Sequence, residues 1–166
     1  MSNLLIIGAG QFGSVVKEIA ESVNSFKRIE FVDDNSQKAI GKLSQLKSLR
    51  NEFSTAIVAL GNAQLRMDCI EKLEALGYEI VTLIHPKAYV SGSAIIEAGS
   101  IVEPMAVVQA NSKVGKGVLV CSGAVIKHNS VVEDGCYIDC NSTVANAYVP
   151  KFTRTVYNQV FKGSEE

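Results

Sequence analysis

The chain has 166 residues, of which 47% are hydrophobic and 20% charged, the composition of an ordinary globular protein. Its formal net charge of −1 gives no reason to expect nucleic acid as a partner. No apolar run is long enough to cross a bilayer and the N-terminus lacks a signal-peptide pattern, so we expect a cytoplasmic protein without a membrane partner.

The first half of the chain alternates strand and helix patterns. Short apolar or alternating runs predict strands at 3–7, 28–32, 54–60 and 79–83, and apolar residues at helical spacing predict helices at 11–23 and 63–76. Residues 35–53 are expected to form a loop with one short helix. Repeated strand–helix–strand order implies parallel pairing with right-handed crossovers, which predicts a small Rossmann-like domain.

Gly8, Gly10 and Gly13 form a G-x-G-x-x-G motif between the first strand and the first helix. Glycines at these positions allow a tight turn and let a phosphate approach the N–H groups at the helix N-terminus. Asp33 or Asp34, at the end of the second strand, would hydrogen-bond ribose hydroxyls. The motif alone is equally compatible with NAD, although the domain is only about half a dinucleotide-binding fold. A turn that binds nothing is the remaining alternative.

From Ile84 onward the hydrophobic pattern has a period of six. Eleven consecutive sixth positions are Val or Ile, and at the position four further on nine of eleven residues are Ala, Ser or Cys. This period fits neither an α-helix nor a flat strand. It is typical of a β-solenoid with a triangular coil, in which each side points one aliphatic residue inward and small residues lie near the corners. The predicted inward residues are Ile84, Val90, Ile96, Val102, Val108, Val114, Val120, Ile126, Val132, Ile138 and Val144.

We therefore predict three segments. Residues 1–83 form the Rossmann-like domain, residues 84–148 form a hexapeptide-repeat parallel β-helix of fewer than four coils, and residues 149–166 form a C-terminal tail. An open solenoid end is a bare sheet edge, so either this tail or another subunit should cover it.

The segments LLIIGAGQFG, FVDD, IVALGNAQLR, LIHPKAYVS and GAVIKHNSVVEDG follow one another between residue 3 and about residue 148. In this order, with eleven hexads, the chain resembles the bacterial sugar acetyltransferases that join a small Rossmann-like N-terminal domain to a left-handed parallel β-helix. The sialic acid O-acetyltransferases and the UDP-4-amino-sugar N-acetyltransferases belong to this group. The resemblance implies left-handed coils, a homotrimer, acetyl-CoA as cosubstrate and a UDP-linked sugar as the other substrate.

The resemblance also implies where the nucleotide sugar binds. The glycine-rich loop would hold the UDP part, with help from the next loop, and Phe12 stands where the family often has a histidine. The predicted substrate-binding residues are Gly8, Gly10, Gln11, Phe12, Gly13, Asp33, Asp34, Gly61 and Asn62.

His128 is the candidate catalytic residue. Acetyl transfer to an amine or hydroxyl needs a general base, and an imidazole suits that role. From the residues alone His128 would be a surface residue at a solenoid corner, but the family's catalytic histidine lies in the matching segment and implies a base here. Asn129 stands where the family usually has an acidic residue that orients this histidine, so we pair it with His128. Tyr137 and Asn146 occupy positions that the resemblance assigns to the acetyl-CoA site.

Four cysteines are present, with no C-x-x-C spacing, and reduced thiols are the default in the cytoplasm. Cys136 and Cys140 are four residues apart, but a metal site needs further ligands nearby and the local sequence offers none. We therefore expect no metal.

Three functions stay open. The favoured one is an acetyl-CoA-dependent acetyltransferase acting on a nucleotide-linked amino sugar for a surface glycan, because His128 lies in a well-matched segment. The second is a catalytically weak or inactive nucleotide-sugar-binding scaffold, favoured because the repeat ends near Pro150 whereas the family continues for several coils. The third is a sialic-acid-type O-acetyltransferase on the same fold.

Overall fold

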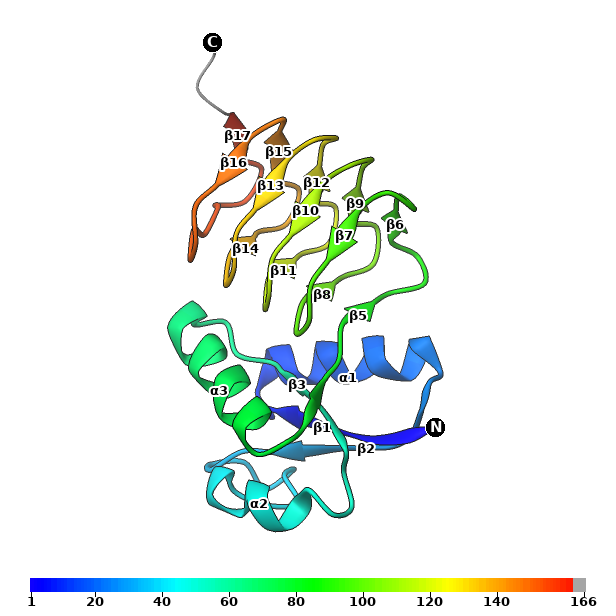
Figure 1. Cartoon of the computed structure of the whole chain (residues 1–166), viewed down its shortest axis with the longest axis vertical. Coiled ribbons are helices and arrows are strands. Elements are labelled where there is room, and N and C mark those ends of the chain that lie inside the picture. Colours follow the sequence, from blue (N-terminus) through cyan, green and yellow to red (C-terminus); the bar gives the residue numbers. More distant parts are fainter. Residues whose placement is uncertain (163–166) are drawn as a thin grey trace. The chain divides into compact units, whose positions relative to one another are not determined.

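The structure, a computed structural model, describes residues 1–162 and divides into two compact units, which meet in the sequence between Val81 and Thr82. We call the first unit 1 and the second unit 2 (Figure 1). Among the described residues, none of the helices combines the length and the apolar character that a membrane span requires.

Unit 1 is built on a four-stranded sheet in the order β2-β1-β3-β4, and all of its strand pairs are parallel, as predicted. Its strands are β1 (Ser2–Ile7), β2 (Phe26–Val32), β3 (Thr55–Val58) and β4 (Glu79–Ile80). Its helices are α1 (Gln11–Val23), the short η1 (Leu43–Gln45) and α2 (Leu46–Leu49), and α3 (Ala63–Ala75).

The central strands β1 and β3 are buried on both faces, which explains why they read as continuous apolar runs rather than alternating ones. Residues 4–7 of β1 and all of β3 are buried. The helix α1 contributes Val16, Ile19 and Ala20, none more than 2% exposed. Burying apolar side chains such as these stabilises unit 1.

The predicted strand at 79–83 is wrong in its second half. Only Glu79 and Ile80 pair with β3, and Leu83 begins β5, where it pairs with Ile101 of unit 2. The apolar pattern runs without interruption through this segment, so the sequence gives no sign of the point at which the partner strand changes.

Unit 2 is a parallel β-helix with three faces, each a ladder of short parallel strands. The first face holds β5 (Leu83–Ile84), β8 (Ile101–Val102), β11 (Leu119–Val120) and β14 (Tyr137–Ile138). The second holds β6 (Tyr89–Val90), β9 (Val107–Val108), β12 (Val125–Ile126), β15 (Thr143–Ala145) and β17 (Val160–Lys162). The third holds β7 (Ile95–Ile96), β10 (Lys113–Val114), β13 (Val131–Val132) and β16 (Tyr148–Val149).

Neighbouring strands of a face are eighteen residues apart, so one coil is three hexads, and the fold class is confirmed. The inward aliphatics Val120, Ile126 and Val144 are each 0% exposed and form one core. Small residues lie near the corners, as predicted. The buried Ser100 and Ser142 donate their hydroxyls to carbonyls of the next coil at 2.7 and 2.8 Å, so these polar groups are paired inside the prism.

The corners turn through residues in the left-handed conformation. Glycine and asparagine take most of these places because they tolerate positive φ with little strain. The non-glycine residues are Met105, Asn111, Asn129, Asn141, Asn146, Phe152 and Asn158, and the glycines are Gly99, Gly117, Gly123 and Gly135. The spacing is six throughout except between Asn141 and Asn146, so one residue is missing from the corner that follows β15.

The segment predicted as a tail continues the solenoid as far as the structure describes it. Val149 pairs with Val132, Arg154 bridges to Tyr137, and Phe161 pairs with Val144. The inward positions become Val149, Thr155 and Phe161, one residue earlier than the hexad count expects. The sequence pattern missed this coil because the register slips by one and one inward position is polar. Residues 163–166 of the predicted tail lie outside the described residues.

Candidate functional site

The glycine motif forms the turn that joins β1 to α1. Gly8 has a φ of +105°, which only glycine adopts easily, and a Cβ on Gly13 would lie 2.1 Å from the Gly8 carbonyl oxygen. These two glycines are therefore required by the packing of the turn itself. Gly10 is different, because a Cβ there would meet nothing within 4 Å. Its exposed face is the part of the motif that is open to a ligand.

The start of α1 presents backbone donors beside that open face. The helix begins at Gln11 after the N-cap Gly10, and Ser14 donates the first intrahelical N–H, to Gly10, at 3.1 Å. The N–H groups of residues 11–13, which include Phe12 and Gly13, therefore have no acceptor within the helix. Such a helix start suits a phosphate.

Asp33 and Asp34 both hold backbone in place. Asp33 accepts the Ala9 N–H through one carboxylate oxygen and the Asn35 N–H through the other, each at 2.8 Å. These bonds lower the pKa of Asp33, because they favour its charged form. Asp34 accepts the Leu43 N–H at 2.8 Å. Contact of either carboxylate with a ribose stays a prediction.

A hollow of about 180 Å³ lies where β1, β2 and β3 end. Of the residues predicted to bind the substrate, three line this hollow, namely Gly8, Asp33 and Asp34, and six do not, namely Gly10, Gln11, Phe12, Gly13, Gly61 and Asn62. Asn62 caps α3 instead, accepting the Leu65 N–H at 3.0 Å. The full lining is Ile7, Gly8, Val32, Asp33, Asp34, Asn35, Leu43 and Leu60.

His128 lies in unit 2, two residues after β12, at the corner between the second and third faces. Its side chain is exposed and borders a groove of about 500 Å³. Its backbone N–H donates to the Gln109 side-chain oxygen at 3.1 Å. The groove residues that sequence reasoning missed are Tyr89, Ser91, Gln109, Ala110 and Asn111, which come from the two preceding coils.

Two amide side chains meet the Nδ1 atom of His128. Asn129 Nδ2 lies 3.2 Å from it and Asn146 Nδ2 lies 3.5 Å from it. Both asparagines are also left-handed corner residues, stacked in consecutive coils. The predicted pairing of His128 with Asn129 thus has a geometric counterpart, and Asn146 joins it, so both amides position the ring without supplying a charge.

The Asn146 N–H belongs to a residue whose side chain reaches the Nδ1 atom of His128. The corner residues Asn129, Asn141 and Asn158 donate their N–H groups to carbonyls of the preceding coil at 3.0, 3.2 and 3.1 Å. Within residues 1–162, the Asn146 N–H has no such backbone partner. A backbone N–H that has no backbone acceptor is the kind of group that stabilises a developing oxyanion.

Tyr137 does not join His128 in this chain. It lies on β14, and the Arg154 guanidinium lies 4.4 Å from the centre of its ring. Burial is the main cause of the raised pKa of Tyr137. Its predicted contact with acetyl-CoA stays a prediction.

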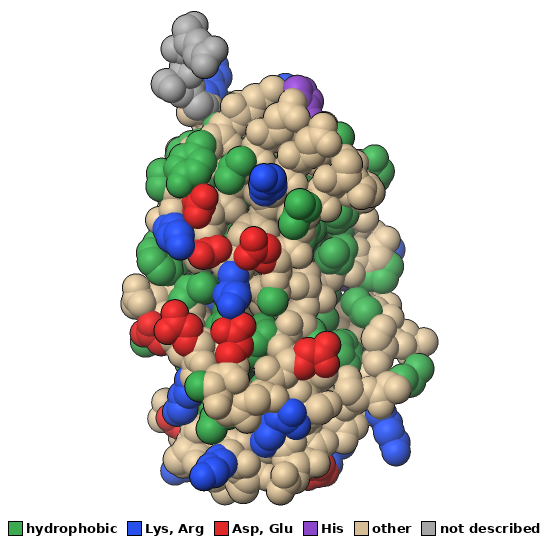
Figure 2. All heavy atoms as spheres, viewed as in Figure 1, with side chains coloured by type: hydrophobic (Ala, Val, Ile, Leu, Met, Phe, Trp, Pro, Cys, Tyr) green, Lys and Arg blue, Asp and Glu red, His purple; other side chains and the backbone are tan. Residues whose placement is uncertain are grey.

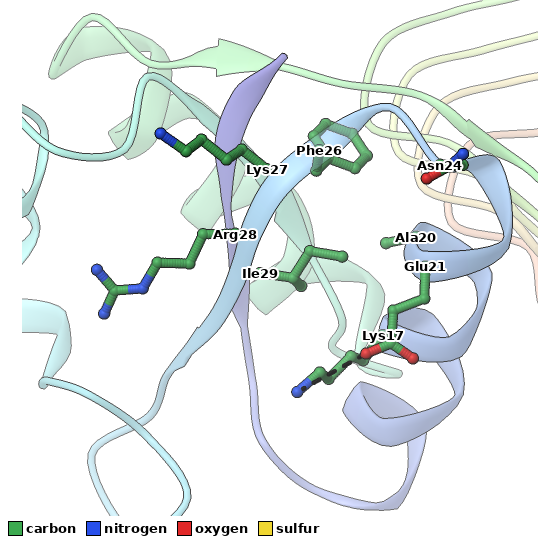
Figure 3. Close-up of a pocket in the computed structure, with 8 residues that line it drawn as sticks. All are labelled: Lys17, Ala20, Glu21, Asn24, Phe26, Lys27, Arg28 and Ile29. Atoms are coloured by element: carbon green, nitrogen blue, oxygen red, sulfur yellow. Dashed lines mark ion pairs between the residues drawn. The ribbon is translucent and has the colours of Figure 1, made fainter.

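A further hollow in unit 1, of about 280 Å³, lies between α1 and the edge strand β2 (Figure 3). Lys17 pairs there with Glu21 at 3.9 Å, and Arg28 pairs with Glu30 at 3.0 Å. Two of the cations that line it, Lys17 and Arg28, are thus already engaged in surface ion pairs, which weakens its attraction for an anion.

The third face of unit 2 carries interspersed acidic and basic side chains (Figure 2). Asp134 accepts the Lys116 N–H at 2.9 Å and pairs with Lys151 at 3.0 Å. These charges belong to solvated, mutually paired loop residues and form no single-sign patch.

Comparison with known proteins agrees with this architecture. The PglD N-terminal domain family matches residues 3–73. The UDP-N-acetylbacillosamine N-acetyltransferase of Bacillus subtilis (strain 168) is 28% identical over 112 residues, which are 61% of this chain and 51% of that protein. The chain thus spans about half the length of this curated relative.

Two solved structures resemble the whole chain. The acetyltransferase domain of PglB from Neisseria gonorrhoeae FA1090, in complex with acetyl coenzyme A, has a TM-score of 0.84 and 33% identity, covering 95% of this chain and 83% of its own. A mutant of perosamine N-acetyltransferase from Caulobacter crescentus, in complex with CoA and GDP-perosamine, has a TM-score of 0.67 at 21% identity, covering 99% and 92%, and shows the shared fold. The fold, its motifs and the likeness to the gonococcal domain together establish that this chain belongs to the bacterial sugar acetyltransferase family that joins a PglD-type N-terminal domain to a hexapeptide-repeat parallel β-helix.

Proposed function

We propose that this chain transfers the acetyl group of acetyl-CoA to the amine of a nucleotide-linked amino sugar during the synthesis of a surface glycan. The observation that carries the proposal is His128, placed on a 500 Å³ groove with its Nδ1 atom held by two amides, in a chain 33% identical to a domain solved with acetyl coenzyme A. The cosubstrate is acetyl-CoA, and the proposed chemistry needs no metal.

In the proposed reaction the sugar amine attacks the thioester carbonyl carbon. The new C–N bond forms, the negative charge passes to the carbonyl oxygen, and the C–S bond then breaks to release CoA. His128 accepts the proton that the amine nitrogen loses. The Asn146 N–H has no backbone acceptor within residues 1–162, and the side chain of the same residue reaches His128, which supports a role for this N–H in stabilising the oxyanion.

This role sets the orientation of the Asn129 amide. If its NH₂ group donates to Nδ1, the neutral ring carries its proton on Nε2, which then cannot accept another. If the amide carbonyl accepts the Nδ1 proton, Nε2 is free to act as the base. The proposal therefore requires the carbonyl of Asn129 or Asn146 to face Nδ1 in the reacting complex.

The nucleotide part of the acceptor is assigned to unit 1. The open face of Gly10, the free N–H groups that follow it and the hollow beside Asp33 support a diphosphate and ribose site. We propose UDP as the nucleotide because the name of the curated relative specifies a UDP-linked sugar.

A homotrimer completes the proposal. The groove beside His128 is open on one side, and the surface of unit 2 exposes large apolar side chains such as Tyr89, Met105 and Tyr148, at 62%, 67% and 59%. A neighbouring copy would cover such residues and close the groove. The molar mass in solution, measured by light scattering during gel filtration, tests this. We place the reaction in the cytoplasm, where both acetyl-CoA and nucleotide sugars are found.

The decisive experiment measures CoA release by chromatography, which avoids the background of the four cysteines. The acceptors are a UDP-linked 4-amino sugar and a sialic acid, and the variants are His128→Ala and His85→Ala. Release should require the amino sugar, fall about 10²- to 10⁴-fold in His128→Ala, and persist in His85→Ala. His85 is the matched control because its Nδ1 accepts the Lys87 N–H at 3.0 Å in a turn.

Two other results would redirect the assignment. Turnover of His128→Ala equal to wild type removes the proposed base. Binding of the sugar nucleotide without any CoA release would identify a scaffold. The two amides at the Nδ1 atom favour this alternative, because neither supplies a negative charge to stabilise the imidazolium. An alkali-labile ester on sialic acid, in place of a stable amide on the amino sugar, would identify an O-acetyltransferase.

A further inference from the structure

Glu103, Cys121 and Cys140 come together on the first face of the solenoid. They follow β8, β11 and β14, and so belong to three consecutive coils. The two sulfur atoms and a carboxylate oxygen all lie within 4.8 Å of one another. The local sequence does not predict this cluster, because the coiling of the solenoid, and not close spacing in the sequence, brings its three members together.

The two cysteines are not core residues of the solenoid. The inward positions of their hexads are held by Val120 and Ile138. Cys136, in contrast, occupies a small-residue position inside the core and is 0% exposed. Cys121 is 1% exposed and Cys140 is half-buried, and neither belongs to the cluster of buried side chains that fills the prism. Packing alone therefore accounts for Cys136 but leaves the pair at Cys121 and Cys140 without a structural reason.

Neighbouring groups hold the carboxylate of this cluster in place. One oxygen of Glu103 accepts both the N–H and the hydroxyl of Ser122, each at 2.9 Å, which fixes the carboxylate and leaves its other oxygen available. Hydrogen-bonded carboxylates of this kind are typical of metal ligands, because the bonds orient the donor atom.

The backbone of Cys140 is also held in place, because its N–H donates to Asp139 at 2.9 Å. Arg154 pairs with Asp139 at 3.2 Å and stacks on the Tyr137 ring. These contacts fix the Asp139 carboxylate that accepts the Cys140 N–H.

We propose that Glu103, Cys121 and Cys140 form a zinc site that clamps three consecutive coils of the solenoid. Thiolate sulfur and carboxylate oxygen are ordinary Zn²⁺ ligands, and tetrahedral bonds of about 2.3 Å to sulfur place ligand atoms about 3.5–4 Å apart. The cluster needs only a small contraction to reach that geometry. A water molecule or the Tyr137 hydroxyl would supply the fourth ligand. The ion is structural and takes no part in acetyl transfer.

The test titrates the reduced full-length chain with Co²⁺, whose thiolate complexes absorb in the near ultraviolet, and then with Zn²⁺ in competition with a chromophoric chelator. The variants are Cys121→Ser, Cys140→Ser and Glu103→Gln, and Cys69→Ser on α3 is the matched control. One ion per chain should bind to wild type and Cys69→Ser. Binding should be lost in both cluster cysteine variants and weakened about 10- to 100-fold in Glu103→Gln. Zinc should raise the unfolding midpoint only in the chains that bind it.

Three results would overturn the proposal. One is the absence of a charge-transfer band in a wild-type chain whose thiols are free. Another is equal binding by wild type and by Cys140→Ser or Glu103→Gln. Both positions are half-buried, so these variants should keep the fold, and circular dichroism checks that they do. The third is a mass two hydrogens lower under mild oxidation, without metal binding before it, which would identify the pair as a disulfide.

Discussion

Asn129 has two roles that its sequence position does not separate. It is a left-handed corner residue with φ of 57°, a place that asparagine fills repeatedly in this solenoid, and its amide also reaches the Nδ1 atom of His128. The sequence predicts the pairing by resemblance to the family. It does not predict that Asn146 joins the pair, because that contact depends on the shortened corner in the next coil.

Two substitutions at Asn129 separate these roles. Asn129→Gly keeps the positive φ without strain and removes the amide, so acetyl transfer should fall while the unfolding midpoint stays close to that of wild type. Asn129→Ala also removes the amide but adds the cost of a left-handed alanine, about 1–2 kcal/mol, and should unfold at a lower temperature. Calorimetry and the CoA-release assay measure the two effects. Full activity in both variants would show that the amide does not position the ring.

Asp33 provides a pH-dependent contribution to the stability of unit 1. Its pKa is lowered in the folded chain by the N–H groups of Ala9 and Asn35, so its charged form is favoured by folding. The contribution is present above its ordinary pKa of about 4 and is lost as the pH falls through the folded value. Asp33→Asn should therefore unfold at lower urea concentration than wild type at pH 7, and the difference should shrink at about pH 3.

Asp34→Asn is the control for this measurement. Its amide oxygen can still accept the single Leu43 N–H, so its stability should stay near that of wild type at both pH values. A gap between Asp33→Asn and wild type that is the same at both pH values would show that the Asp33 charge is not the cause.

At the scale of elements, the β1–α1 turn combines a folding requirement with a candidate binding surface. Gly8 and Gly13 are fixed by close approach, whereas Gly10 is free of neighbours. The sequence motif predicts the turn correctly, but it cannot assign separate reasons to its three glycines. Those reasons depend on which backbone atoms approach each Cα, and the structure alone gives that.

The two alanine variants of this turn should therefore behave differently. Gly13→Ala places a Cβ 2.1 Å from the Gly8 oxygen and should destabilise unit 1 severely. Gly10→Ala should fold like wild type, since its φ of −75° suits any residue, but should bind UDP more weakly because the methyl group occupies the open face. Calorimetry and isothermal titration with UDP measure these effects. Unchanged UDP affinity in Gly10→Ala would move the nucleotide away from this loop.

The period of six predicts the strands of unit 2 with little error, because each strand is only two or three residues long and its inward residue marks it. The prediction fails where the period fails. One residue is absent between Ala145 and Asn146, and Thr155 takes an inward position where an aliphatic residue is expected. Its hydroxyl accepts the Asp139 N–H at 2.7 Å, so the polar side chain is paired and the coil still closes. Pattern alone cannot foresee that compensation.

At the scale of the whole molecule, the last described coil covers the one before it. Thr155 and Phe161 lie over the coil that carries Ile138 and Val144. A chain that ends at Val149 should therefore expose the ladder edges of β14 and β15, lower the unfolding midpoint and increase light scattering through edge-to-edge association. A chain that ends at Lys162 is the control and should match the full-length protein. Equal midpoints for both would show that residues 150–162 contribute nothing to stability.

The eighteen-residue coil also constrains how the length of such a chain can vary. Gain or loss of a whole coil keeps every ladder in register, whereas any other change shifts all later side chains relative to those beneath them. In this chain the register shifts by one residue at the corner after β15, which lies one coil beyond His128. Insertions and deletions at that corner therefore change the residues that border the groove beside His128, while the column of inward aliphatic residues stays continuous. The groove can thus vary without a change in the core of the solenoid.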